Sequence, residues 1–357
     1  MTGTSFRVID TGVREGRANI AFDAALIELH RTGAIPDTIR FLTFQPTALV
    51  GRHQQLGREL RLDYCREHGI GTARRLTGGG AIYMDEGQFG IELAFRRGSL
   101  GISALDDLAR RICTALSAGL SRLGIAARYR PRNDIEVDGR KLCGSGGFFD
   151  GDTLFYQATV LVDMSAERMI SALNVPADKL AAHAIETAAA RIVTLRQLLG
   201  DRLPPTSAIK QAALDGLAAE LGISPEIGEI TREEENLAHR LFDEEIGTDA
   251  FVAGEAAAAA GPDMRVFSQR TPGGTISAQT RLAASGSPRL QDVLITGDFF
   301  VTPPRLILDL EAALRGCPVS EIGARTLAFF AARKADVLSA RPEDFAATIA
   351  RAAAGPE

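Results

Sequence analysis

The stretch RRLTGGGAIYMDEGQ, residues 74–88, places three consecutive glycines shortly after two arginines. Glycines cost backbone entropy in an element interior and add nothing to a core, so we expect packing not to account for them. Their backbone can approach a ligand closely and aim amide N–H groups at it. Because arginine is a preferred partner of carboxylates and phosphates, Arg74 and Arg75 favour an anion-binding loop over a tight turn with a mobile tip.

Neither of two common nucleotide-binding motifs explains this stretch. No Gly-Lys-Ser/Thr follows the glycines, as a Walker loop requires, and the Gly-x-Gly-x-x-Gly spacing of dinucleotide-binding folds is absent. Strand-like residues follow the tract at Ile82 and Tyr83, and again at 90–95. We therefore expect a glycine-rich loop held between strands.

The composition limits the class of protein. The chain has 357 residues, of which 45% are hydrophobic, so two or three domains with a sizeable core are expected. A net charge of −5 argues against nucleic acid or an anionic membrane as the main partner. The N-terminus is polar and no long apolar run occurs, which predicts no signal segment and no membrane span. Four cysteines without paired spacing suggest reduced thiols in a cytoplasmic protein.

Hydrophobic periodicity predicts an α+β fold for most of the chain. Apolar residues recur at helical spacing in several segments, whereas short alternating runs predict strands. The expected helices are 17–31, 60–68, 104–123, 166–173, 193–199, 207–221 and 231–241, and the expected strands are 6–9, 40–44, 48–52, 90–95, 128–130, 134–137, 141–143 and 154–162. No regular β-α alternation is present, which favours mixed sheets with flanking helices over a doubly wound parallel sheet.

An alanine-rich run at 256–262, ending in Gly261 and Pro262, predicts a linker. It divides a larger N-terminal domain, residues 1–255, from a small α+β domain, residues 262–357. In the second part, strands at 264–269 and 275–282 flank the turn Pro272-Gly273-Gly274. A further strand at 293–301 and helices at 304–315, 320–332 and 342–353 are expected.

A second group of functional candidates lies at residues 132–147, RNDIEVDGRKLCGSGG. Asp138-Gly139 predicts a hairpin turn with Asn133 and Asp134 on one strand and Lys141 on the other. A lysine before a glycine-rich tract suits a point charge on a phosphate or a polarised carbonyl, although a lone lysine is more often a solvent-exposed turn residue. Asp134 is a candidate Mg²⁺ ligand or the residue that forms an Asx turn.

These segments together resemble the lipoate–protein ligase family, within the superfamily that includes biotin–protein ligases and octanoyltransferases. The resemblance rests on GRHQ at 51–54, RRLTGGGAIY at 74–83, Asn133-Asp134, GRK at 139–141 with Gly144-Ser145, and TVL at 159–161, in that order. It covers roughly residues 5 to 250. The segment ITGDFF at 295–300, before a helix, looks like the accessory domain of two-domain ligases.

The resemblance implies a two-step reaction. Lipoate and ATP, with Mg²⁺, give lipoyl-adenylate and pyrophosphate, and a lysine of an acceptor lipoyl-domain protein then takes the acyl group as an amide. Lys141 would hold the carbonyl oxygen and α-phosphate, and Asn133 and Asp134 would serve the nucleotide and Mg²⁺. The remaining implied pocket residues are Arg75, Thr77, Gly78 and Gly79 for the acyl chain and phosphate, Gly80, Ala81 and Ile82 for the adenine, and Gly144, Ser145 and Thr159.

Two departures and one cysteine leave alternatives open. Met84 and Gln157 stand where the family usually has histidine, which bears on the choice between lipoate and octanoate. Cys143 is a possible acyl carrier for an ATP-independent octanoyl or lipoyl transferase, although a small buried cysteine is the expected role. A third alternative is a non-catalytic binding protein. We also expect His53 near the pocket mouth, Asp298 at the accessory-domain contact, and Phe299-Phe300 in a core.

Overall fold

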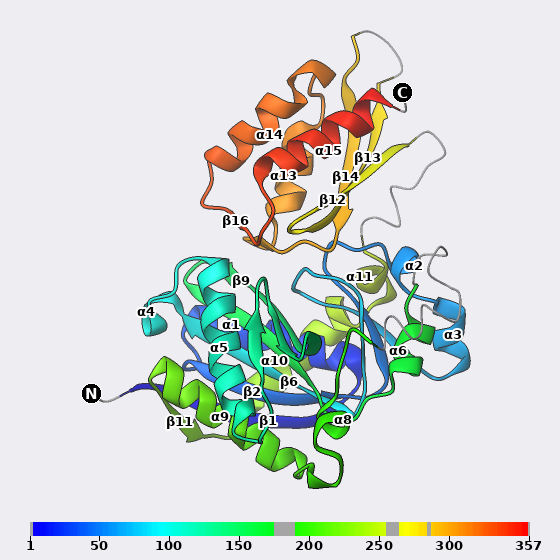
Figure 1. Ribbon diagram of the computed structural model, residues 1–357. Helices are drawn as coiled ribbons and strands as arrows, with labels where there is room; N and C mark the ends of the chain where they lie inside the picture. The colour runs from blue at the N-terminus through cyan, green and yellow to red at the C-terminus, as the bar shows by residue number, and fades with distance from the viewer. Residues whose placement is uncertain (1–2, 175–189, 255–263, 284–286, 356–357) are drawn as a thin grey trace.

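The computed structural model describes residues 3–174, 190–254, 264–283 and 287–355. These residues form two lobes, a larger one from the N-terminal part of the chain and a smaller one that follows residue 263 (Figure 1). The expected linker at 256–262 lies outside the described residues. None of the described helices is both long enough and apolar enough to cross a bilayer.

An eight-stranded mixed sheet forms the centre of the larger lobe, in the order β11-β1-β2-β6-β10-β9-β8-β7. Strands β11, β1 and β2 pair in parallel, whereas the pairs from β2 to β7 are antiparallel. This arrangement confirms the expected α+β class. The strands are β1 (Thr4–Arg14), β2 (Thr38–Phe44), β6 (Gln88–Arg96), β7 (Arg128–Arg130), β8 (Asp134–Val137), β9 (Arg140–Asp150), β10 (Thr153–Leu161) and β11 (Ile223–Ile227).

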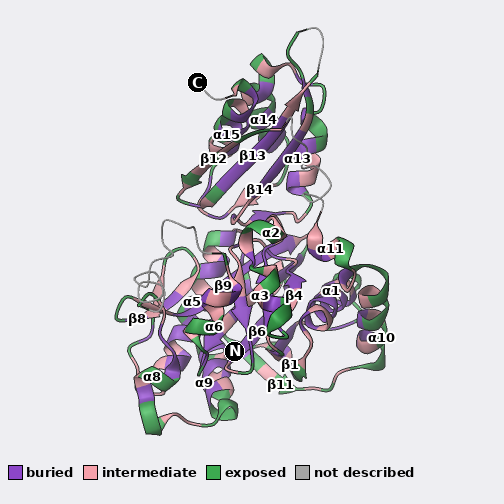
Figure 2. Ribbon diagram, turned by 90° about the vertical axis from the view of Figure 1, so that its right-hand side faces the viewer, coloured by how far each residue is buried: buried purple, intermediate pink, exposed green. Residues whose placement is uncertain are grey.

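Helices cover both faces of this sheet, and alternation along each strand decides which side chains meet them. Val8 and Phe95 pack with helices α5 (Leu105–Ser121) and α9 (Thr206–Leu221) on one face. Their neighbours Ile9 and Ala94 pack with α1 (Gly16–Thr32) and α10 (Arg232–Leu241) on the other. The central strands β2, β6 and β10 are almost wholly buried, as Figure 2 shows for β6. The middle of the sheet is thus packed on both faces.

Capping residues explain where two of these helices begin and end. Gly33 ends α1 in the left-handed region with φ 80°, and Thr231 begins α10 in a capping box with Glu234. The other helices of this lobe are α2 (Leu56–Glu59), α3 (Leu62–Glu67), α4 (Arg97–Leu100), α6 (Ala166–Ala172), α8 (Leu195–Leu199), η2 (Gly200–Arg202), η3 (Phe242–Ile246) and α11 (Asp249–Ala253).

A second, three-stranded sheet carries the glycine tract. Strand β3 (Thr47–Val50) pairs in parallel with β4 (Gly71–Arg74) and antiparallel with β5 (Ile82–Met84). The glycines therefore lie in the loop from β4 to β5, between strands, as the sequence predicts.

The smaller lobe has a hydrophobic core of its own, built from residues between Ile276 and Ala353. Its sheet is β12 (Arg265–Thr271), β13 (Gly274–Leu282) and β14 (Leu290–Gly297), accompanied by α13 (Leu306–Leu314), η4 (Val319–Glu321), α14 (Ile322–Ala331) and α15 (Pro342–Ala354). The expectation of one strand at 293–301 is wrong, because β14 ends at Gly297 and β15 (Val301–Thr302) pairs instead with β16 (Asp336–Val337). Residues 298–300, between β14 and β15, reach the larger lobe.

Candidate active site

One cavity of about 360 Å³ brings both predicted segments together, between the glycine tract and strands β9 and β10. Every site residue expected from the sequence lines it: Arg75, Thr77, Gly78, Gly79, Gly80, Ala81, Ile82, Asn133, Asp134, Lys141, Gly144, Ser145 and Thr159. The Thr77 hydroxyl oxygen is buried and has no hydrogen-bond partner. A buried polar atom without a partner is costly, which makes this hydroxyl, on a residue that lines the cavity, a candidate contact for a ligand.

The two arginines beside the glycine tract bind the backbone, which differs from the direct anion contact that the sequence suggests. Arg75 donates through Nη2 to the carbonyl oxygens of Gly80 and Gly78, at 2.7 and 3.2 Å. Arg74 donates to the carbonyls of Gln54 and Val252, at 2.7 and 2.9 Å. Burial lowers the pKa of each guanidinium to about 10, so both stay charged at neutral pH. Arg75 therefore fixes the loop's shape while placing its charge at the cavity wall.

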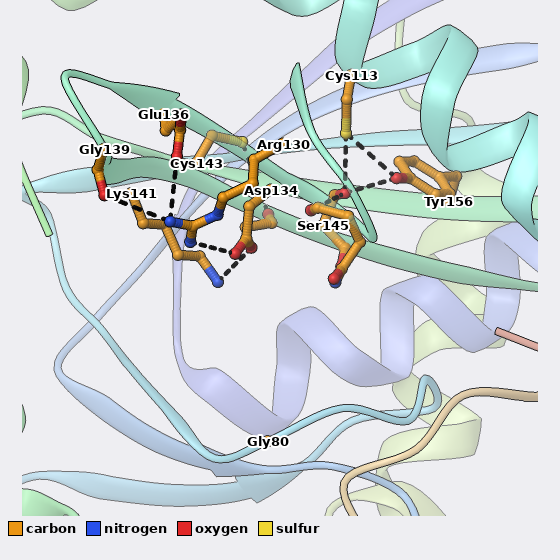
Figure 3. A network of polar contacts seen from close by, with 12 residues as sticks. Gly80, Cys113, Arg130, Asp134, Glu136, Gly139, Lys141, Cys143, Ser145 and Tyr156 are labelled. Carbon is orange, nitrogen blue, oxygen red and sulfur yellow. Dashed lines mark hydrogen bonds and ion pairs between the residues drawn. The ribbon is translucent and has the colours of Figure 1, made fainter. Parts of the chain in front are cut away.

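Lys141 contributes the ammonium group on the opposite wall (Figure 3). Its Nζ lies 2.7 Å from Asp134 Oδ1, and Arg130 Nη2 lies 2.7 Å from Oδ2 of the same carboxylate. Burial alone would raise the pKa of Asp134, but the two cations lower it. The Lys141 backbone is held by Arg191 and Val193, through N–H···O distances of 2.8 and 2.9 Å. The lysine is thus positioned by its backbone and by its carboxylate partner.

The Gly-Ser-Gly-Gly tract lies inside strand β9 and pairs with β10, which explains its glycines by packing. A Cβ on Gly144 would come within 2.5 Å of Lys141 Nζ, so glycine there leaves room for the lysine side chain. A Cβ on Gly147 would come within 2.3 Å of the Phe155 carbonyl oxygen. The sequence correctly indicates a close approach at these glycines, and the approaching groups belong to the protein itself.

A hydrogen-bond network around Ser145 positions Asn133 at the cavity. The Ser145 N–H and hydroxyl donate to the Asn133 carbonyl oxygen at 2.9 and 2.6 Å. The Asn133 amide donates in return to the Ser145 carbonyl. Ser145 Oγ also lies 2.5 Å from Tyr156 Oη and 3.2 Å from Cys113 Sγ. Because Tyr156 and Cys113 are fully enclosed, they hold Ser145, and through it Asn133, from behind.

None of the four cysteines lines this cavity. Cys143 is 0% exposed and belongs to the core between β9 and the helices. Burial is the main cause that raises the pKa of its thiol, and burial raises the pKa of Cys113 likewise. Both groups are therefore neutral thiols at neutral pH, which is the weakly nucleophilic form.

Among the described residues, no three His, Cys, Asp or Glu side chains gather as a metal site. Two carboxylates line the cavity, Asp134 and Asp298, and both oxygens of Asp134 accept from cations. Mg²⁺ in nucleotide sites is held by one or two carboxylates together with the substrate phosphates. The residues present fit a cation brought in by a polyphosphate rather than a resident metal.

The smaller lobe supplies cavity residues that the sequence did not predict: Gly273, Asp298, Phe300 and Leu338. The expectation of a core pair is confirmed for Phe299, which is buried in the smaller lobe, and wrong for Phe300, whose partly buried ring lies against Gly79 and Gly146. The expectation that packing does not account for the glycine tract is also wrong for Gly78 and Gly79, which face Phe299 and Phe300. Asp298, expected at the contact between the lobes, lines the cavity. The sequence does not indicate which of the two adjacent phenylalanine rings faces the cavity.

His53 does not line the cavity and lies instead at the contact between the lobes. Its ring stacks on Phe299 with centroids 5.1 Å apart, and its carbonyl accepts from Gly297 N–H at 2.9 Å. Burial, together with the nearby Arg52 and Arg74, lowers the pKa of His53 to about 3. The histidine is a neutral contact between the lobes.

Comparison with known proteins identifies the class. Residues 15–218 match the model of the lipoyl protein ligase A/B catalytic domain, and the chain belongs to this family. It is 27% identical over 263 residues to the lipoate-protein ligase LplJ of Bacillus subtilis, covering 73% of this chain and 75% of that one. It is 28% identical over 223 residues to the octanoyltransferase LipM of Moorella thermoacetica, covering 57% of this chain and 82% of that one.

The fold extends over both lobes in one solved structure. The structure of Plasmodium falciparum LipL1 in complex with lipoate aligns with 93% of this chain and 95% of that one, with a TM-score of 0.70 and 15% identity. The two-lobe architecture is thus shared at low sequence identity. The protein is an enzyme of the lipoate ligase and octanoyltransferase class.

Proposed function

We propose that this protein is an ATP-dependent lipoate–protein ligase. It activates lipoate as the acyl-adenylate and transfers it to a lysine of an acceptor lipoyl-domain protein. The observation that carries the proposal is the content of the cavity: a lysine ammonium, a free hydroxyl and a glycine loop line it, whereas no thiol does. A transferase of this fold that carries the acyl group on cysteine needs a thiol within reach of the substrate.

The chemistry follows from charge. A carboxylate becomes an acyl donor only when joined to a good leaving group, and joining it to ATP concentrates negative charge at one point. Lys141 Nζ provides a fixed positive charge there, held ready by Asp134, so little reorganisation is needed when the anhydride forms. The Thr77 hydroxyl adds a neutral donor. ATP with Mg²⁺ is the implied co-substrate, and Asp134 is the proposed magnesium ligand.

The second candidate is acyl transfer through Cys143, favoured only by its position two residues after Lys141 and by the LipM relatives. Pyrophosphate release with lipoate, ATP and Mg²⁺ separates the two. We expect release that requires lipoate, is lost in Lys141→Ala and persists in Cys143→Ser, with Cys317→Ser as the matched control. An acyl-thioester on the wild-type protein, formed without ATP, would contradict the ligase. Lipoate binding with neither reaction would indicate a binding protein.

A further inference from the structure

A small chamber of about 20 Å³ adjoins the main cavity. The two spaces share five lining residues: Arg75, Ile82, Met84, Gln157 and Thr159. Lys141 lines the main cavity but not the chamber. The chamber therefore lies away from the point where the carbonyl would be held. A space of this size holds about one water molecule or the end of a chain. It is therefore the place for the far end of a bound acyl group.

One side of the chamber is apolar, as an acyl site requires, and is formed by Ile20, Leu42, Phe44, Leu49 and Ile82. The other side is not. Asp23 and Glu92 line it, although both are almost completely buried. A saturated chain gains nothing from buried carboxyl groups, so their presence at this place requires a reason.

The two carboxyl groups share one cation. Arg40 Nη1 lies 2.6 Å from Asp23 Oδ1 and 2.9 Å from Glu92 Oε2, while Arg40 Nη2 donates to Asn19 at 2.6 Å. Burial raises the pKa of both acids, that of Glu92 well above its usual value. Because one guanidinium faces two buried carboxyl groups, its charge offsets the effect of burial on them only in part. The chamber wall is thus polar where these groups lie.

Gln157 stands between this wall and the main cavity. It lies on β10 directly opposite Glu92 on β6. Gln157 lines both spaces, and its side chain makes no hydrogen bond to any residue that the structure describes. An amide has two donor hydrogens and an acceptor oxygen. At the end of an acyl slot, it is free to bind the tail.

We propose that the wall around Gln157, where the main cavity meets this chamber, selects an acyl chain that ends in sulfur, the ring of lipoate or its reduced dithiol, over the methyl end of octanoate. This inference rests on the proposed function. Sulfur is polarisable and accepts a weak hydrogen bond, and a thiol also donates one. A methyl group would displace water from the Gln157 amide and the acid pair without replacing any hydrogen bond. Met84, also on the wall, adds a second polarisable sulfur.

The test compares lipoate with octanoate on the full chain, by calorimetric binding and by kcat/KM for pyrophosphate release. We expect the wild type to favour lipoate by at least about tenfold, since an unreplaced hydrogen bond costs about that factor. Gln157→Leu should reduce the ratio at least about fivefold, by weakening lipoate and strengthening octanoate. Gln157→Asn should keep part of the preference, and the exposed Gln211→Leu provides a matched control that keeps all of it.

Three results would overturn the inference. The first is a wild type that uses the two acids equally or prefers octanoate. This result does not depend on whether Gln157→Leu folds. An unchanged ratio in a folded Gln157→Leu would show that the larger lipoate ring is chosen by size alone. Pyrophosphate release with neither acid, and binding of neither, would instead refute the proposed function and this inference with it.

Discussion

Replacing Gly146 by alanine tests how the smaller lobe closes the cavity. A Cβ at this position would lie 2.1 Å from Phe300 Cε1 and 2.7 Å from Cζ. Because carbon atoms pack at about 3.5–4.0 Å, the ring would have to move by roughly 1.5 Å. Strand β9 cannot yield easily, since Gly146 pairs with Gln157 on β10.

Overpacking of this kind costs about 1–3 kcal/mol. For a unit of about 150–250 residues each kcal/mol lowers the melting temperature by about 2–4 °C, so Gly146→Ala should lower it by roughly 2–12 °C. In a Phe300→Ala background the clash is gone, and the same glycine substitution should cost less by at least about 1 kcal/mol. Gly323→Ala, at a helical glycine with no atom within 4 Å of the added Cβ, is the control and should not destabilise.

The assay is thermal unfolding of the four proteins of this double-mutant cycle, followed by circular dichroism. Coupling between the two sites is expected only if the ring occupies the space above Gly146. Equal effects of Gly146→Ala with and without the Phe300 ring would refute the seating of the smaller lobe described above.

Three further predictions concern single side chains. Lys141→Gln should reduce acyl-adenylate formation by roughly 100-fold or more, since removing one preorganised donor costs about that much; a loss below tenfold would contradict its role. Cys143→Ser should leave the rate of adenylate formation within about twofold, because the thiol is buried and neutral, and a large loss with the fold intact would favour the transferase. The low pKa of His53 means that the unfolded chain binds more protons between pH 6.5 and about 3, so stability is fully present above pH 6.5 and falls as the pH drops through that window. His53→Phe should keep the stacking on Phe299 and show a smaller fall in melting temperature from pH 7 to 5; an unchanged pH dependence would argue that the histidine is solvated.

The parts of the site that could be predicted are those that depend on short-range sequence. The turn at Asp138-Gly139 fixes the hairpin that brings Lys141 opposite Glu136 and beside Asp134. The strands on either side of the glycine tract fix its place as a loop. Each relation spans only a few residues, so pattern and turn chemistry are enough to establish it.

The parts that could not be predicted depend on contacts between distant segments. Arg74 is saturated by carbonyls of residues 51–54 and 251–253, and no local pattern shows that those carbonyls converge on it. The acid pair at the chamber and the arginine between them are likewise assembled from three elements, α1, β2 and β6, each of which reads as an ordinary helix or strand. Periodicity identifies a buried face but does not identify which buried polar residues meet across it.

The glycine tract shows how one sequence signature can serve two purposes. A Cβ on Gly78 would lie 2.1 Å from the Phe299 carbonyl oxygen, and Gly79 combines φ 92° with a ring atom of Phe300 at 2.6 Å from an added Cβ. Glycine at these positions is therefore required by the smaller lobe, whatever ligand is bound. At Gly80 the nearest atom to an added Cβ is 3.9 Å away, so protein packing leaves that position open on the cavity side. The loop that lines the substrate cavity is thus also the surface on which the smaller lobe sits, and a change in how that lobe is seated must change the shape of the cavity.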